Sequence, residues 1–195
     1  MYCLRGFLDN PAFSSDDVEK ANSVPQKPIR AREPRASRPI MPGYGIADAA
    51  ASKGLLPWKW ARERLTKSHN YWIATTYPDG RPHVMVIWGL WLDEKFYFST
   101  GGQSRKARNL AANPRCVIST EKSAEAVIVE GVAELIPVVY DPAFLKKFIR
   151  LYKKKYDWKI DGNEGNIYAV HPRMAFGLFE KDFTGAATRW QFPSA

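Results

Sequence analysis

The sequence predicts a mainly β domain, an antiparallel barrel or sandwich with a few helices beside it. About seven short segments alternate in polarity or are rich in β-branched residues, and only three segments have helical spacing. Most of these segments are joined by short turns, which leave no room for the crossover helices of a parallel sheet. With 195 residues, 45% of them hydrophobic, the chain is long enough for one domain with a core.

Residues 1–53 differ in composition from the rest of the chain. Five prolines lie between Val24 and Gly45 and alternate with arginines. Because proline lacks an amide donor and has a fixed φ, we expect this stretch neither to pair into a sheet nor to continue a helix. We interpret residues 1–53 as an arm that is flexible or wraps a partner subunit, and residues 54–195 as the folded domain.

The folded part begins with a helix and a hairpin. Pro57 suits the first turn of a helix over residues 58–69. Residues 71–91 are expected to form the hairpin, with the Pro-Asp-Gly-Arg sequence at 78–81 as its turn. The remaining strands and helices are expected at residues 96–100, 103–112, 115–120, 124–136, 142–156, 166–172 and 174–180.

The clearest chemical signal lies between Phe98 and Asn109. A strand ends in two hydroxyl residues, two glycines let the backbone approach a ligand, and Ser104 can cap a helix that starts with Arg105 and Lys106. Cations in the first turn oppose the helix dipole unless an anion binds there. The segment therefore predicts a phosphate cradle. The alternative is that Ser104 only caps the helix and the cations are solvated surface.

Five blocks follow one another within residues 56–192: PDGRPHVMVIW, FYFST, SRKARNLAANPR, VIVEGVAEL and TRWQF. In this order they resemble the pyridoxamine 5'-phosphate oxidase-like family of FMN-binding split β-barrels, which includes enzymes that use the deazaflavin coenzyme F420. The resemblance implies a six- to seven-stranded antiparallel split β-barrel. It also implies a homodimer with the cofactor at its interface, and Trp-rich apolar strands such as IWGLWL favour such pairing.

The resemblance also implies where a cofactor would bind. The strand over residues 83–88 would run along the isoalloxazine ring, the segment 98–109 would hold the phosphate, and two residues near the C-terminus would approach the ring. The cofactor-binding residues expected on this basis are His83, Met85, Val86, Ile87, Trp88, Ser99, Thr100, Ser104, Arg105, Lys106, Arg108, Arg189 and Trp190.

One departure separates this chain from pyridoxamine phosphate oxidases in the strict sense. Those enzymes carry a basic phosphate ligand near the position of Met85, whereas this chain has no Lys or Arg from His83 to Trp91. The resemblance then implies a flavin- or deazaflavin-dependent oxidoreductase for a small organic substrate, with FMN as cofactor and F420 as the alternative. We name no catalytic acid or base, because the cofactor carries the hydride chemistry. The second interpretation is a split barrel that binds or senses FMN or haem without turnover.

The charge and the remaining motifs limit the partners. The net charge is +9, mostly from the folded part, and it would suit the acidic glutamyl tail of F420. The basic residues form no aromatic-interleaved stripe, so we expect no nucleic-acid partner. No apolar stretch approaches about eighteen residues, so we expect no membrane span.

The cysteines and histidines predict neither a disulfide framework nor a metal site. Cys3 and Cys116 lie far apart in different contexts, which fits a reducing compartment, and we find no signal-peptide pattern. We therefore expect a cytoplasmic protein. His69, His83 and His171 are too scattered in the sequence to indicate a metal site.

Overall fold

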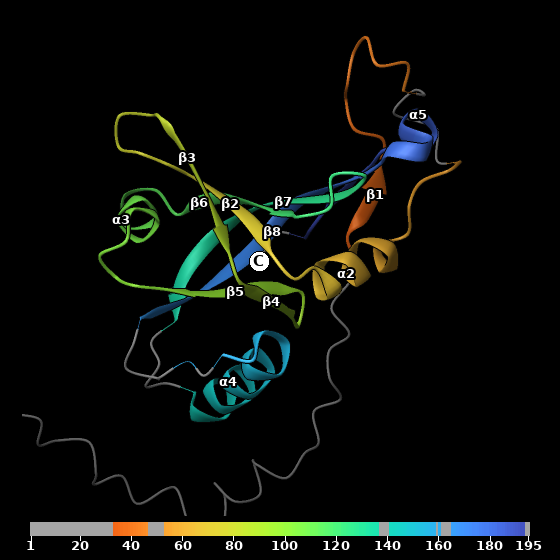
Figure 1. Cartoon of the computed structure of the whole chain (residues 1–195). Coiled ribbons are helices and arrows are strands. Elements are labelled where there is room, and N and C mark those ends of the chain that lie inside the picture. Colours follow the sequence, from red (N-terminus) through yellow and green to blue (C-terminus); the bar gives the residue numbers. More distant parts are fainter. Residues whose placement is uncertain (1–32, 47–52, 137–140, 159, 161–164, 194–195) are drawn as a thin grey trace, which may run out of the picture. The chain divides into compact units, whose positions relative to one another are not determined.

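The structure is a computed structural model that describes residues 33–46, 53–136, 141–158, 160 and 165–193. Figure 1 shows the elements, which are in chain order β1 (Arg35–Ser37), α2 (Trp58–Lys67), β2 (Tyr71–Thr76), β3 (Pro82–Ile87), β4 (Gly89–Leu92), β5 (Lys95–Thr100), α3 (Arg105–Ala112), β6 (Arg115–Thr120), β7 (Glu125–Ile136), α4 (Pro142–Tyr156), β8 (Asn166–Phe179), a 3-10 turn (Glu180–Asp182), α5 (Phe183–Ala186) and β9 (Thr188–Gln191).

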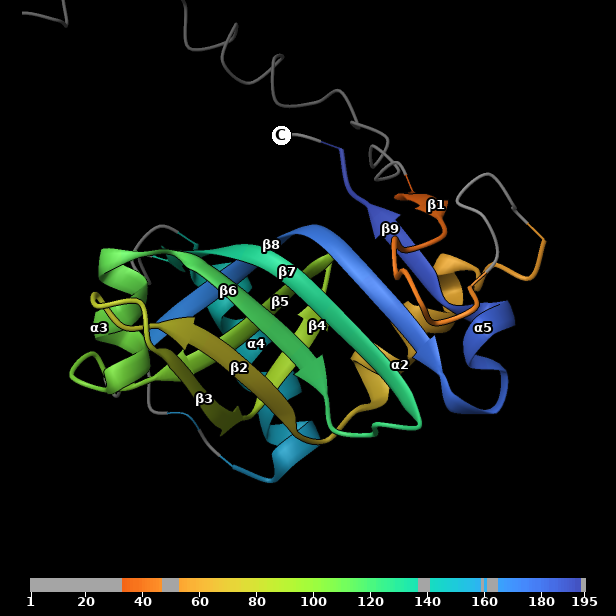
Figure 2. The same cartoon turned by 90° about the horizontal axis from the view of Figure 1, so that it is seen from above.

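Antiparallel pairing joins these strands into one sheet with the order β1-β9-β8-β7-β6-β2-β3, while β5 pairs with β8 and β4 with β5. The long strands β7 and β8 pair along their length, with a bulge at Glu130 and Gly131. The sheet curls round toward itself (Figure 2). It does not close, because β3 pairs with β2 and the next strand, β4, pairs with β5. The expected antiparallel split barrel is confirmed.

The described part of the chain has nine strands instead of the expected six or seven, because β1 and β9 were not among the expected strands. Two further differences cancel in the count. The segment after the first hairpin turn divides at Trp88 into β3 and β4. The last two expected strands are instead one strand, β8, which continues through Pro172 and Arg173. Strand pairing explains both differences. β3 pairs with β2 whereas β4 pairs with β5, and β7 pairs with β8 along its length.

β1 corrects the expectation that the proline- and arginine-rich stretch cannot pair into a sheet. Its three residues pair antiparallel with β9. They lie between Pro34 and Pro39, so no proline occupies a paired position, and the strand is at the edge of the sheet. The next residue, Arg38, is only 2% exposed, and its Nη1 donates to the carbonyl oxygen of Ala187 at 3.0 Å. Residues 1–32 of the proposed arm lie outside the described residues, and its role stays a prediction.

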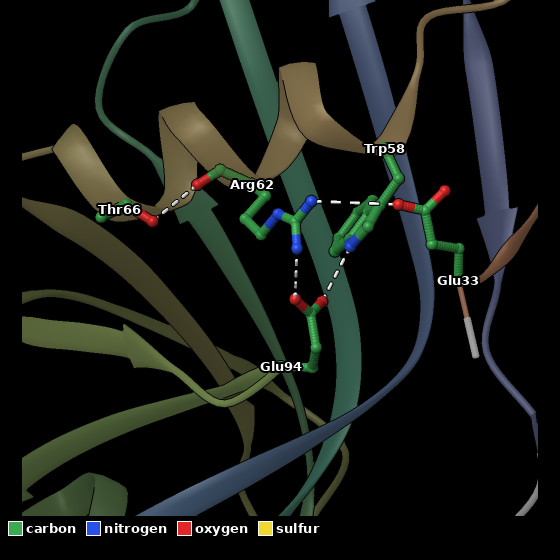
Figure 3. A network of polar contacts seen from close by, with 5 residues as sticks. All are labelled: Glu33, Trp58, Arg62, Thr66 and Glu94. Atoms are coloured by element: carbon green, nitrogen blue, oxygen red, sulfur yellow. Dashed lines mark hydrogen bonds and ion pairs between the residues drawn. The ribbon is translucent and has the colours of Figure 1, made fainter. Parts of the chain in front are cut away.

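Polar contacts fasten α2 to the β4–β5 turn and to the start of the described chain (Figure 3). The indole of Trp58 donates to Glu94 at 2.7 Å, and Arg62 lies 3.3 Å from the other oxygen of that carboxylate. Arg62 also lies 3.9 Å from Glu33. Within α2, the hydroxyl of Thr66 donates to the carbonyl oxygen of Arg62 at 2.7 Å. The ion pairs are partly exposed and contribute at most about 1 kcal/mol each. The buried Trp58 is the larger anchor of this helix.

Two layers of apolar side chains meet at β4 and β5. One layer fills the barrel and includes Phe96 and Phe98, both fully buried. The other layer packs α4 against the opposite face of the same strands, through Tyr97 and Phe148. Successive side chains of β5 therefore point to opposite faces of the sheet, and both faces are covered. It places α4 beside the gap between β3 and β4.

Gly89 begins β4 where no side chain fits. A Cβ at this position would overlap the ring of Phe96 and lie 2.7 Å from the carbonyl oxygen of Tyr97. Gly89→Ala is therefore expected to lower the free energy of unfolding by about 1–3 kcal/mol, the usual cost of overpacking. Thermal or urea unfolding measures the change. Gly101→Ala is the matched control, because nothing lies within 4 Å of its added Cβ. Equal stability of both variants would contradict the close packing at Gly89.

Cys116 is buried on β6, and burial raises the pKa of its thiol to about 12. Because the thiolate is the reactive form, we expect iodoacetamide not to label Cys116 in the folded protein at about pH 8. Labelling should become complete after unfolding in guanidinium. The measurement uses a Cys3→Ser variant, since Cys3 is the other cysteine of the chain. Fast labelling of that variant while folded would show that Cys116 is accessible.

No helix within the described ranges is long and apolar enough to cross a membrane.

Candidate cofactor site

A cavity of about 250 Å³ lies at the split in the barrel. It is lined by residues from β3, the β3–β4 break, β5, α3 and α4, namely Val86, Ile87, Trp88, Ser99, Lys106 and Tyr152. Elements far apart in the sequence therefore converge on one place.

The barrel opens here because one edge of β3 has no partner strand among the described residues. Met85 pairs across the strands with Ile73, so the two side chains share a face of the sheet. Ile73 is completely buried, whereas Met85 is 47% exposed. The inner face of the barrel is thus covered along β2 and uncovered along β3.

The predicted helix cap is confirmed in α3. Ser104 Oγ accepts a hydrogen bond from the amide of Ala107 at 3.2 Å and lies 3.1 Å from Thr100 Oγ1. The amide of Arg108 donates to the carbonyl oxygen of Ser104 at 3.1 Å. The earlier amides, those of Arg105 and Lys106, are the end groups that a helix leaves for an anion. The hydroxyls of Thr100 and Ser104 support the loop, and Ser99 is the one that lines the cavity.

Lys106 is the cation of this cavity. Burial lowers the pKa of its ammonium group, which means that the charged form is poorly solvated where it lies. No carboxylate in the described part of the chain forms an ion pair with it. A bound anion would supply the missing opposite charge.

Arg105, Arg108 and His83 lie outside the cavity lining. Arg105 is exposed, and its guanidinium carbon lies 4.9 Å from the centre of the Tyr77 ring. His83 contacts the same ring edge-on at 5.6 Å, and its Nδ1 lies 3.2 Å from Thr75 Oγ1. Arg108 is exposed on α3. The helix therefore separates two neighbouring cations, with Lys106 at the cavity and Arg105 beside Tyr77.

Arg189 and Trp190 also lie away from the cavity, on β9. Trp190 is completely buried and packs edge-on against Trp58 at 5.4 Å. Arg189 donates from Nε to Ser37 Oγ at 3.1 Å. In the described chain neither side chain lines the cavity, and the fully buried indole is out of reach of a ligand. Side chains alternate between the two faces of β9, so Trp190 is buried in the core and Arg189 lies on the opposite face.

The contribution of α4 to the cavity was not predicted from the sequence. Tyr152 lines the cavity, and burial raises the pKa of its phenol to about 12, so it stays protonated near neutral pH. One turn later the ring of Tyr156 stacks on Trp88, with 4.8 Å between ring centres and 9° between planes. The sequence signal for these residues is the interval of four between Phe148, Tyr152 and Tyr156. That spacing predicts a packed helix face, but it does not predict a cavity wall.

Comparisons with known proteins agree with this architecture. The family model described as pyridoxamine 5'-phosphate oxidase matches residues 58–183. Among solved structures, the chain is similar to a conserved hypothetical protein from Mycobacterium tuberculosis, with 21% identity over 64% of this chain and 86% of that one and a TM-score of 0.55. A FAD-binding protein from Mesorhizobium loti has 17% identity over 69% and 95% of the two chains and a TM-score of 0.54. A putative pyridoxamine 5'-phosphate oxidase from Listeria innocua has 15% identity over 60% and 93% and a TM-score of 0.50. At these identities the likeness shows the fold. No curated protein matches the chain.

Proposed function

This chain belongs to the pyridoxamine 5'-phosphate oxidase family, and from that premise we propose that it is a flavin-dependent oxidoreductase that binds FMN at the split of its barrel. One observation carries the proposal. The cavity combines an apolar strand end, a hydroxyl and a half-buried lysine that has no ion-pair partner among the described residues. A ligand with a planar ring and a phosphate matches that combination.

The residues of the chain bind and orient the cofactor in this proposal. Lys106 and the first amides of α3 hold the phosphate, and Ser99 donates a hydrogen bond to it. Val86, Ile87 and Trp88 would lie beside the ring, where their apolar side chains would exclude water. The bound flavin supplies the chemistry, which is acceptance and donation of a hydride to or from a small organic substrate.

A second copy of the chain completes the site in this proposal. The cavity is smaller than the roughly 300–1,000 Å³ that is typical of ligand sites. Beside it, Trp72 and Val84 lie on the outer face of β2 and β3 and are 47% and 53% exposed. An apolar face next to an unpaired strand edge favours self-association, for which two-fold symmetry is the commonest solution.

F420 is the alternative cofactor, and the position of Arg105 favours it. Arg105 and Arg81 contact the Tyr77 ring at 4.9 and 4.7 Å, so the two cations gather outside the cavity but near the start of α3. Arg81 is paired with Asp79 at 2.9 Å, whereas Arg105 forms no ion pair within the described chain and is the cation available to a longer anionic tail. Because such a tail is multiply charged, F420 affinity should fall more steeply with salt than FMN affinity.

Titration of the purified protein with FMN and with F420 tests the proposal. We expect at least one of the two to bind with a dissociation constant of about 1 µM or lower, which corresponds to about −8 kcal/mol. Turnover of the bound cofactor with an added reductant and acceptor then separates an oxidoreductase from a protein that only binds flavin. Failure of both cofactors to bind would contradict the proposal, and binding without any turnover would favour the storage or sensing function.

A further inference from the structure

Two consecutive residues at the end of α4 hold the backbone of Gly89 from one side. Lys155 Nζ donates to the carbonyl oxygen of Gly89 at 3.1 Å. The hydroxyl of Tyr156 lies 2.8 Å from the same oxygen, and it accepts a hydrogen bond from the amide of Gly89 at 2.9 Å. The amide and the carbonyl oxygen of Gly89 are therefore both bound by side chains of α4.

Gly89 lies at the break on which the cavity depends. Ile87 ends β3, Trp88 crosses the gap, and Gly89 starts β4. Trp88 is fixed on two sides, because its ring stacks on Tyr156 and its Nε1 donates to Asn70 at 3.1 Å. The cavity wall from Val86 to Trp88 is thus followed directly by Gly89, and both Trp88 and Gly89 contact side chains of α4.

The ammonium of Lys155 makes two further polar contacts besides the one with Gly89. It also donates to the hydroxyl of Tyr71 at 2.8 Å and lies 3.5 Å from the carbonyl oxygen of Thr66 in the last turn of α2. Carbonyl groups at a helix C-terminus stabilise a cation. Burial lowers the pKa of Lys155 to about 8, and no carboxylate of the described residues forms an ion pair with it. A half-buried charge without an ion-pair partner among the described residues is costly to place, and here its hydrogen bonds join α2, α4 and the break.

We infer that Lys155 and Tyr156 are positioning residues for the proposed cofactor site, and that they act by holding the strand break at Trp88 and Gly89. Neither residue lines the cavity. They would act on a bound cofactor through the segment from Val86 to Trp88, which lines the cavity. The effect on FMN rests on the proposed function, whereas the effect on the backbone of Gly89 does not.

The experiment compares three variants with a matched control. Lys155→Met removes the ammonium, and Tyr156→Phe removes only the hydroxyl while the ring that stacks on Trp88 remains. Lys155→Arg keeps a charged donor. Lys154→Met removes the same charge from an exposed neighbouring position of the same helix.

Hydrogen exchange at Gly89, measured without added cofactor, reports the position of the break. We expect K155M and Y156F to accelerate exchange of this amide about tenfold or more relative to the amides of Ile73 and Val129, because local opening becomes easier. FMN affinity should fall by about five- to tenfold in the same two variants, which is a part of what a hydrogen bond to a charged group is worth. K154M should match the wild type in both measurements, and K155R should regain most of the affinity.

The two proposals fail in different ways. If the wild type binds neither FMN nor F420, the proposed function is wrong, and exchange at Gly89 alone decides whether the two residues hold the break. Where the wild type binds FMN, the inference is overturned if K155M and Y156F keep its affinity, or if their affinity falls while exchange at Gly89 is unchanged. Acceleration that equals that of Ile73 and Val129 would mean a general loss of stability, and would also overturn it.

Discussion

Replacing Lys106 with alanine should weaken FMN binding by about 10- to 100-fold, because a hydrogen bond between two charged groups in a partly desolvated site is worth about 1.5–3 kcal/mol. Lys106 lines the cavity, and burial lowers its pKa, so the free protein carries the cost of an unneutralised ammonium. Removal of that ammonium should leave the melting temperature without FMN unchanged or slightly higher. Quenching of flavin fluorescence measures the affinity, and calorimetry measures the stability.

Arg105→Ala is the matched control for this experiment. Arg105 precedes Lys106 in the same helix turn, but it is exposed and lies against Tyr77. The variant should therefore weaken FMN binding by only about twofold, in line with the small effect of an exposed charge. For F420 we expect a larger loss in R105A than for FMN. An equal loss of FMN affinity in both variants would show that the phosphate lies outside the cavity, between the two cations.

Val84→Glu should convert a dimeric protein into a monomer of 22.2 kDa. Val84 is 53% exposed on the outer face of β3, does not line the cavity, and belongs to the proposed interface. A carboxylate that must be buried without a partner costs several kcal/mol, so the dimer dissociation constant should rise by about 100-fold or more. Light scattering at micromolar concentration measures the mass, and we expect FMN affinity to fall together with the dimer.

Ile40→Glu is the control for the dimer experiment, since Ile40 is apolar and 76% exposed but follows β1 at the other end of the sheet order. It should leave both mass and FMN affinity unchanged. A wild-type protein that is monomeric at these concentrations would refute the dimer. A V84E monomer that keeps full FMN affinity would show that one chain forms the whole site.

The segments with local signals were predictable. Asp141 caps α4 by accepting from the amide of Phe144 at 2.8 Å, and Pro142 occupies the first turn, as the residue types imply. The hairpin turn at residues 78–81 follows from proline, aspartate and glycine at the positions that such a turn requires, with Gly80 at a positive φ of 88°. In each case the interactions that decide the conformation lie within a few residues of one another.

The candidate site was predictable only in part, for a related reason. Ser104 as a helix cap follows from its neighbours, but the division of labour between Arg105 and Lys106 depends on where α3 meets β3 and β5. Trp190 belongs to a short segment near the C-terminus, and only pairing of β9 with β8 turns its ring into the core. No local pattern contains that information.

The sequence by itself determined the antiparallel fold class, the cap and first turn of α3, and the basic character of that turn. Those features depend on alternation, turn residues and helix ends, all of which act over a few residues. Only the tertiary structure decided that β3 and β4 part at Trp88, that Tyr152 joins Lys106 around one cavity, and that Lys155 and Tyr156 reach Gly89. Each of these depends on contacts between segments that are distant in the chain, because the packing of a strand or helix against its neighbours fixes which of its side chains meet.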